Sequence, residues 1–295
     1  MAFGPTGREK SVAAIVAKRA KESGMQVEVD ALGNVIALGG PEGPRYVFCA
    51  HMDQPGWMVE HMDQKGILHL KPLPAGNKLG QGWGIDENTD IYRISSNDDG
   101  KKQEAESLGK GYAGMGTYIV PKPEFEYSSE AVFASALSDR LPAAVLLEAA
   151  NGIDFSHPVA FCFYTGRYIK AAGLLAALDG LDIERCYTLE VLKSSGDINA
   201  GMGTVILLRS RQSIAPHSWE RELAGFTENL GVKLQKAVRP ENFSAADVLS
   251  RSGLPSLVLG IALDYNGTRI EKACISDFDD LKELVKTLSS GGKAG

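Results

Sequence analysis

The chain has 295 residues, of which 44% are hydrophobic and 23% are charged, which predicts a globular protein with one large domain or a domain plus an insertion. The formal net charge of -6 argues against a general surface for nucleic acids or anionic membranes, because such surfaces are basic. No apolar stretch approaches the roughly 18 residues that span a membrane. From the net charge and this second observation together, we expect neither a nucleic-acid nor a membrane partner.

The first quarter of the chain contains one helical pattern followed by strand patterns. We predict a helix over 9–23, a hairpin over 25–38, a buried strand over 45–50 and a strand pair over 56–73. Gly33 and Asn34 give the turn signal of the hairpin, and Lys65 with Gly66 gives that of the strand pair.

Residues 74–130 differ from the rest in being rich in Gly, Asn, Asp, Ser and Lys, with short strand-like pieces. We expect a small β-rich insertion over 64–131. The main domain would then combine 1–63 with 132–295.

Strands and helices alternate over the second half of the chain. We predict helices over 141–152, 170–180, 218–231 and 276–290, and strands over 158–165, 184–192, 203–210 and 255–262. Ser276 would cap the last helix, with Asp279 at the capping-box position. This order predicts an α/β sheet with helices on both faces. Sites in such sheets lie at the carboxyl ends of strands, where His51, Thr165 and Glu190 are expected.

The cysteines are widely separated, and no CxxC occurs. They are Cys49, Cys162, Cys186 and Cys274. Such a pattern is typical of buried free thiols in a reducing compartment, so we expect a cytoplasmic protein.

The sequence HMDQ occurs twice, beginning at His51 and at His61. His51 follows a buried strand and has Asp53 two residues later, an arrangement that can form half of a metal site but is more often structural. His61 and His69 fall in an alternating strand pair and are expected to be surface residues. A P-loop and a GxSxG nucleophile elbow are both absent from the sequence.

Eight segments in order resemble the tetrahedral (TET) aminopeptidase family, which includes glutamyl and deblocking aminopeptidases and proteins once labelled CelM endoglucanases. The likeness covers nearly the whole chain. The segments are FGPTGREKSV, VEVDALGNVIA, AHMDQPGWMV, ALSDRLPAAVLLE, FCFYTGRYIKAAG, TLEVLKSSGD, FSAADV and LGIALDYNGTRIEKACISDFDDL. The resemblance implies a zinc-peptidase-like α/β fold with a small β insertion used in subunit assembly, and therefore a homo-oligomer.

In that family two metal ions, usually zinc or cobalt, share a bridging aspartate, and a glutamate acts as general base. The family's metal-binding histidine corresponds to His51, and its orienting carboxylate corresponds to Asp53. A metal-binding aspartate corresponds to Glu190, which is one methylene longer and still able to coordinate.

The remaining family positions carry residues of other types. The bridging aspartate corresponds to Ser138, the general base to Arg167, a glutamate ligand to Tyr168 and the last histidine to Gly267. Serine and tyrosine are poor ligands for zinc. A guanidinium about 5 Å from a dication would cost roughly 7 kcal/mol at an effective dielectric constant near 20. Arg167 could instead replace the metal as the positive charge of the site, paired with Glu190 or Asp53.

These replacements leave three functional hypotheses. The first is a catalytically inactive pseudo-aminopeptidase without a metal cofactor, serving as a scaffold, binding protein or regulatory partner of an active paralogue. The second is an active peptidase with a single zinc or cobalt ion on His51, Asp139 and Glu190, which would act on peptides. The third is a metal-independent enzyme or anion binder that uses Arg167.

Overall fold

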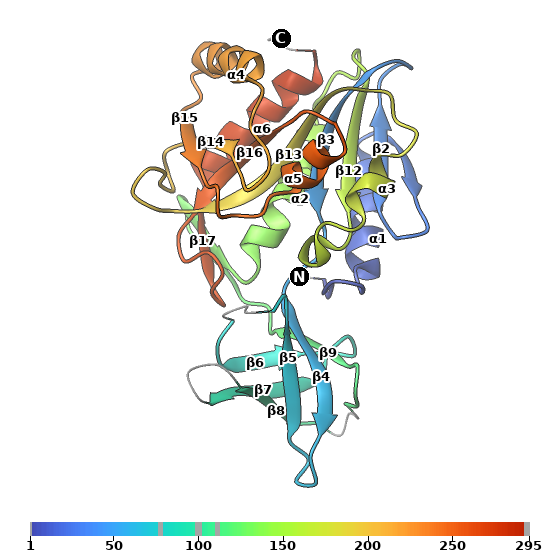
Figure 1. Cartoon of the computed structure of the whole chain (residues 1–295), viewed down its shortest axis with the longest axis vertical. Helices are drawn as coiled ribbons and strands as arrows, with labels where there is room; N and C mark the ends of the chain where they lie inside the picture. Colours follow the sequence, from blue (N-terminus) through green and yellow to red (C-terminus); the bar gives the residue numbers. More distant parts are fainter. Residues whose placement is uncertain (1, 76–78, 98–101, 110–112, 292–295) are drawn as a thin grey trace.

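The computed structural model describes residues 2–75, 79–97, 102–109 and 113–291. It consists of an α/β body and a small β-barrel that extends from one end of the body (Figure 1). Within those ranges no helix is both long and apolar enough to cross a membrane.

A twisted sheet forms the centre of the body. In the described part of the chain it has eight strands, in the spatial order β1 (Gln26–Val29), β2 (Val35–Gly39), β12 (Val159–Tyr164), β3 (Arg45–His51), β13 (Ile183–Lys193), β16 (Ser256–Leu263), β14 (Thr204–Arg209) and β15 (Leu234–Val238). The four central strands β12, β3, β13 and β16 are parallel. Strands β12 and β16 are buried along their whole length, which explains their continuous apolar sequences.

Helices cover both faces of this sheet. One face is packed by α1 (Lys10–Glu22), α2 (Leu137–Ala150), α4 (His217–Leu230) and α6 (Ile275–Ser289). The other face is packed by the short helices α3 (Leu174–Leu178) and α5 (Ala245–Arg251). The predicted α/β fold class is therefore confirmed.

The barrel is closed by six strands in the described residues. Their order around the barrel is β4 (Gly56–Met62), β5 (Leu68–Leu73), β8 (Lys102–Ser107), β7 (Ile91–Asn97), β6 (Gly82–Ile85) and β9 (Tyr118–Pro121). The side chains of Trp57 and Tyr92 are buried in its separate hydrophobic core.

The barrel limits differ from the expected insertion limits of 64 and 131. Strand β4 begins at Gly56 and already belongs to the barrel, because it pairs with β5 and β9. The chain leaves the barrel after Pro121 and forms a small sheet from β10 (Phe125–Tyr127), β11 (Ala131–Ala134) and β17 (Glu271–Cys274). We therefore propose 56 and 121 as the insertion limits. Residues 76–78, 98–101 and 110–112 of the insertion lie outside the described residues.

Several local predictions require correction. The predicted cap at Ser276 is wrong, because β17 runs directly into α6 and Cys274 occupies the N-cap position without a side-chain hydrogen bond. A capping box does form at α5, between Ser244 and Asp247. Helix α5 and strand β15 were not predicted, and α3 is shorter than the predicted helix over 170–180.

Candidate functional site

The candidate site lies where the parallel strands end, beside the passage into the barrel. His51 is the last residue of β3, and Glu190 lies toward the end of β13. Arg167 and Tyr168 belong to a 3₁₀ turn, η2 (Arg167–Ile169), that follows β12. The sheet therefore brings segments that are far apart in sequence to one edge, as expected for a parallel α/β sheet.

Asp53 lies behind the site and is fully buried. Its Oδ2 accepts a hydrogen bond of 2.6 Å from the Thr6 hydroxyl, and its Oδ1 accepts one of 3.0 Å from the backbone N–H of Arg167. The backbone N–H of Tyr168 is 3.3 Å from Oδ2. Burial raises the pKa of Asp53, but the His51 ring, Thr6 and the Arg167 N–H outweigh it and hold the pKa below its usual value. Asp53 thus fixes the backbone of the turn as an ionised carboxylate.

The same segment orients His51. The His51 Nδ1 is 3.1 Å from the backbone oxygen of Asp53 and 3.7 Å from its carboxylate. Because a carbonyl oxygen only accepts hydrogen bonds, Nδ1 carries a proton in this contact. His51 also lines the cavity of the site.

Ser138 is held by Glu271, a residue that our sequence reasoning did not assign to the site. The Ser138 hydroxyl donates to Glu271 Oε1 at 2.9 Å, and the Ser138 backbone N–H donates to Oε2 at 2.8 Å. The backbone N–H of Gly267 donates to Oε1 at 2.7 Å. Glu271 therefore satisfies an N–H of the first turn of α2, a position where a carboxylate also interacts favourably with the helix dipole.

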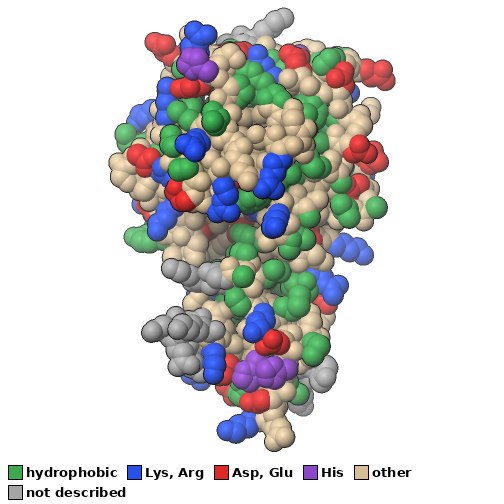
Figure 2. Space-filling model, viewed as in Figure 1, with side chains coloured by type: hydrophobic (Ala, Val, Ile, Leu, Met, Phe, Trp, Pro, Cys, Tyr) green, Lys and Arg blue, Asp and Glu red, His purple; other side chains and the backbone are tan. Residues whose placement is uncertain are grey.

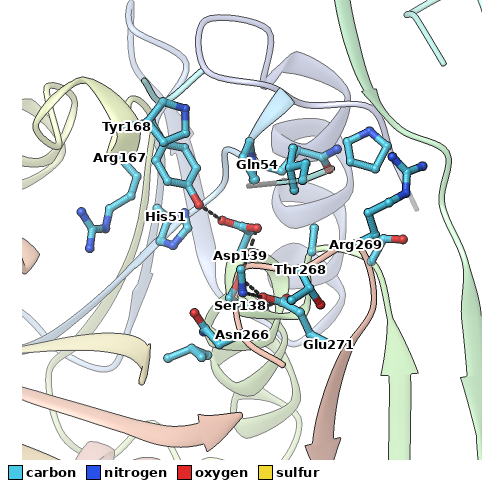
Figure 3. A pocket seen from close by; sticks show the side chains of 18 of the residues that line it. His51, Gln54, Ser138, Asp139, Arg167, Tyr168, Asn266, Thr268, Arg269 and Glu271 are labelled. Carbon is cyan, nitrogen blue, oxygen red and sulfur yellow. Dashed lines mark hydrogen bonds between the residues drawn. The ribbon is translucent and has the colours of Figure 1, made fainter. Parts of the chain in front are cut away.

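Asp139 and Tyr168 form the centre of the site (Figure 3). The Tyr168 hydroxyl donates a short hydrogen bond to Asp139 Oδ1. Burial and the nearby Glu271 carboxylate raise the pKa of Asp139 to about 7, although His51, Tyr168 and Arg140 act in the opposite direction. Asp139 thus changes charge near neutral pH.

The guanidinium of Arg167 points away from Asp139 in Figure 3 and is held on the other side of the site. Its Nη2 is 3.5 Å from Glu190 Oε2 and 3.1 Å from the backbone oxygen of Phe243, and its Cζ lies 4.9 Å from the centre of the Phe243 ring. Burial lowers the pKa of Arg167, but Glu190 outweighs this effect, so the pKa is raised and the guanidinium stays charged. The other Glu190 oxygen accepts hydrogen bonds from the Ser244 hydroxyl at 2.7 Å and the Ala245 N–H at 2.6 Å.

These side chains line a cavity of about 420 Å³ between the body and the barrel. The predicted site residues that line it are His51, Ser138, Asp139, Arg167, Tyr168, Glu190 and Gly267. Asp53 supports it from behind. The body supplies the polar wall, and the connections to the barrel and the barrel itself supply an apolar wall of Pro55, Pro74, Leu79, Pro121 and Pro123.

Two groups that the sequence reasoning missed bind predicted site residues. Glu271 had a usable signal, because it lies inside the C-terminal segment that resembles the family, four residues after Gly267. Ser244 binds Glu190 from 54 positions away and Phe243 binds Arg167 from 76 positions away, and the segment FSAADV that contains both residues gave no indication of these partners.

A metal ion at this site would have to compete with contacts that its carboxylates already make. The carboxylates that would bind metal already accept hydrogen bonds from protein groups, Asp139 from Tyr168 and Glu190 from Ser244 and Ala245. The charged guanidinium of Arg167 lies beside Glu190, where a second cation would be repelled. Among the described residues, no group of three or more His, Cys, Asp and Glu side chains has an arrangement that could hold a metal ion.

The sequence model of the M42 glutamyl aminopeptidase family matches residues 97–284. The lysyl aminopeptidase of Pyrococcus furiosus is 24% identical over 310 residues, which cover 91% of this chain and 88% of that protein.

Solved structures share the fold. The TET1 peptidase of Pyrococcus horikoshii, described as assembling into a tetrahedron or a large octahedral shell, superposes with a TM-score of 0.87 at 19% identity, covering 97% of this chain and 96% of that chain. A TET aminopeptidase from a marine sediment archaeon, Thaumarchaeota archaeon SCGC AB-539-E09, superposes with a TM-score of 0.88 at 20% identity, covering 98% of this chain and 93% of that chain.

Proposed function

The chain belongs to the M42 glutamyl aminopeptidase family, and we propose that it is a member without metal-dependent peptidase chemistry that acts as a binding or regulatory protein. The observation that carries this proposal is the position of Arg167. Its charged guanidinium is 3.5 Å from Glu190, the residue that corresponds to a metal-binding aspartate of the family.

The surrounding contacts support the same proposal. Arg167 is held by the Phe243 carbonyl and ring as well as by Glu190, so it has several partners that keep it in the site. Tyr168 corresponds to a glutamate of the family and donates a hydrogen bond to Asp139 Oδ1, so a metal would have to share this oxygen with the tyrosine. The arginine and tyrosine thus take over as partners of the carboxylates, and a closed hydrogen-bond network replaces the metal centre.

The same contacts argue against the two other functional hypotheses. A single metal ion on His51, Asp139 and Glu190 would have to compete with Tyr168 and Arg167 for the two carboxylates. An anion in the cavity would have to compete with Glu190 and the Phe243 carbonyl for Nη2 of Arg167.

A comparison of the metal content of the wild type with that of a His51 variant tests the proposal. The wild type and His51→Ala are incubated with excess Zn²⁺ or Co²⁺, desalted and analysed by elemental mass spectrometry, and both are assayed with aminoacyl chromogenic substrates. We expect the two proteins to hold the same amount of metal and to release no product. A metal ion lost on substitution of His51, or turnover that this substitution abolishes, would refute the proposal.

A gain-of-metal variant serves as the positive control. It restores the family residue types through Ser138→Asp, Arg167→Glu, Tyr168→Glu and Gly267→His, and its folding is verified by circular dichroism. We expect this variant to bind metal in a manner that a further His51→Ala substitution removes.

We further propose that the chain self-associates through its barrel. Support comes from a structural neighbour with a TM-score of 0.85 that is described as a dodecamer. The molar mass in solution, measured by light scattering after size-exclusion chromatography, tests this proposal, and a mass equal to 31.6 kDa at micromolar concentration would contradict it.

A further inference from the structure

A surface groove lies on the side of the body where the small sheet β10–β11–β17 meets helices α2 and α6. Its volume is about 330 Å³, and its lining is apolar apart from one arginine and one cysteine. Val132 and Ala273 line it from the sheet, Leu141 lines it from α2 and Phe278 lines it from α6. The groove shares no lining residue with the cavity, so it is a separate feature of the surface.

Strand β10 borders the groove and leaves its two aromatic side chains largely uncovered. Phe125 and Tyr127 are 61% and 76% exposed, and their ring centres are 6.1 Å apart. They lie opposite Ala134 and Val132 of β11, which line the groove, and residues directly opposite in paired strands point to the same face of a sheet. The aromatic rings thus extend the apolar surface of the groove, and a contiguous apolar surface of this kind marks an interaction site.

Strand β10 also has an open backbone edge. It lies at the end of its sheet, with β11 as its neighbour on one side and no described strand on the other. On either side of β10, the backbone groups of Glu124 and Ser128 bond across to the opposite strand. Because bonding alternates along an antiparallel strand, the N–H and C=O groups of Phe125 and Tyr127 point away from β11. An extended segment can therefore bind these groups as a further strand.

The charge on this hairpin favours a basic partner. Glu124, Glu126 and Glu130 are exposed and form no ion pair with a described residue, and Lys122 is the one basic residue of the segment 122–130. On the face of the molecule shown in Figure 2, by contrast, acidic and basic side chains both occur over the body and the barrel. Glu126 lies between the two aromatic residues and points to the opposite face of the sheet. A second copy of this chain paired along β10 would bring these acidic residues together, whereas a basic segment would be attracted.

We propose that the groove binds an extended segment of a partner protein in which apolar residues alternate with lysine or arginine. The backbone of this segment pairs with Phe125 and Tyr127, its apolar side chains enter the groove, and its basic side chains lie on the face of Glu126. Such a partner goes beyond the binding role proposed above by stating the chemistry that is recognised. Because the groove and the cavity are separate, the two proposals can fail independently.

Fluorescence anisotropy tests the proposal with the labelled peptide Gly-Lys-Val-Lys-Ile-Lys-Val-Gly, blocked at both ends and titrated with the full chain. We expect saturable binding that Phe125→Ser weakens at least tenfold, because this substitution removes an aromatic ring that borders the groove. A peptide with glutamate in place of each lysine should bind the wild type at least tenfold more weakly. Glu126→Lys should reduce this preference for the basic peptide several-fold. The matched control is Glu228→Lys, which makes the same change in net charge at an exposed residue of α4 and should leave the preference unchanged.

Three results would overturn the proposal. The first is the absence of measurable binding of the basic peptide to the wild type at millimolar protein, and the second is equal affinity of the wild type and Phe125→Ser for it. The third is a lower molar mass of Phe125→Ser than of the wild type in light scattering, which would identify a second copy of the chain as the occupant. Circular dichroism of each variant verifies that it is folded. The metal test of the cavity is unaffected, because His51 does not line the groove.

Discussion

Asp139→Asn should make the protein more stable at alkaline pH, because Asp139 is buried and its pKa in the folded state is raised to about 7 from its ordinary value of 3.8. The folded state then binds more protons than the unfolded state between these two values, so stability falls as pH rises through that interval. An asparagine carries no charge, and its side-chain oxygen can still accept the hydrogen bond from Tyr168.

The magnitude follows from the linkage relation. With the two pKa values above, the raised pKa of Asp139 lowers the free energy of unfolding by roughly 2 kcal/mol at pH 5 and by roughly 4 kcal/mol at pH 8. The free energy of unfolding of Asp139→Asn should therefore rise relative to the wild type by roughly 2–3 kcal/mol between these pH values.

Urea unfolding of both proteins at the two pH values provides the assay. Groups that titrate in both proteins cancel in the difference, so the change reports Asp139 alone. Asp179→Asn, at an exposed aspartate after α3, is the matched control and should show a constant difference from the wild type. A difference for Asp139→Asn that stays constant or shrinks toward pH 8 would refute the reasoning.

Three further substitutions test the network. Asp53→Asn should destabilise the protein by about 2–3 kcal/mol at pH 7, because the substitution removes one of the two oxygens that accept backbone N–H groups. The difference in unfolding free energy between the variant and the wild type should close as pH falls through the lowered folded-state pKa of Asp53, and urea unfolding at pH 7 and pH 3 measures both effects. Tyr168→Phe should lower the free energy of unfolding in urea by about 1–2 kcal/mol and raise the pKa of Asp139 above its wild-type value. Carboxyl carbon NMR would detect the change in pKa, and an unchanged pKa would contradict the hydrogen bond. Glu190→Gln should cost about 2 kcal/mol in the same unfolding assay, because the charge of Arg167 loses its partner, and a change below about 0.5 kcal/mol would mean that the pair contributes little.

The sequence predicted the strands and the sheet edge well because the signals were local. The continuous apolar residues of β12 and β16 indicated buried parallel strands, and both are central in the sheet. The resemblance of ordered segments to the TET aminopeptidases predicted the family, which the comparison confirmed. The site residues taken from that resemblance lie around one cavity, and their roles remain proposals.

The misses came from interactions between distant residues. Ser276 looks like a helix cap in the sequence, but pairing of β17 with β11 holds the chain extended through Cys274, and the helix begins one residue before that serine. The role of Glu271 depends on a β-strand that places its carboxylate at the first turn of α2, 133 residues earlier. Amphipathic periodicity contains no information on such contacts.

Asp53 holds the turn after β12 through the backbone N–H groups of Arg167 and Tyr168 and not through their side chains. Every residue type except proline offers the same N–H, so the geometry of this turn is largely insensitive to which side chains occupy the two positions. Evolution could therefore exchange the chemistry at this edge of the sheet while the backbone stayed in register. The same property makes the two positions suitable for protein engineering, since new functional groups can be introduced there without redesign of the scaffold.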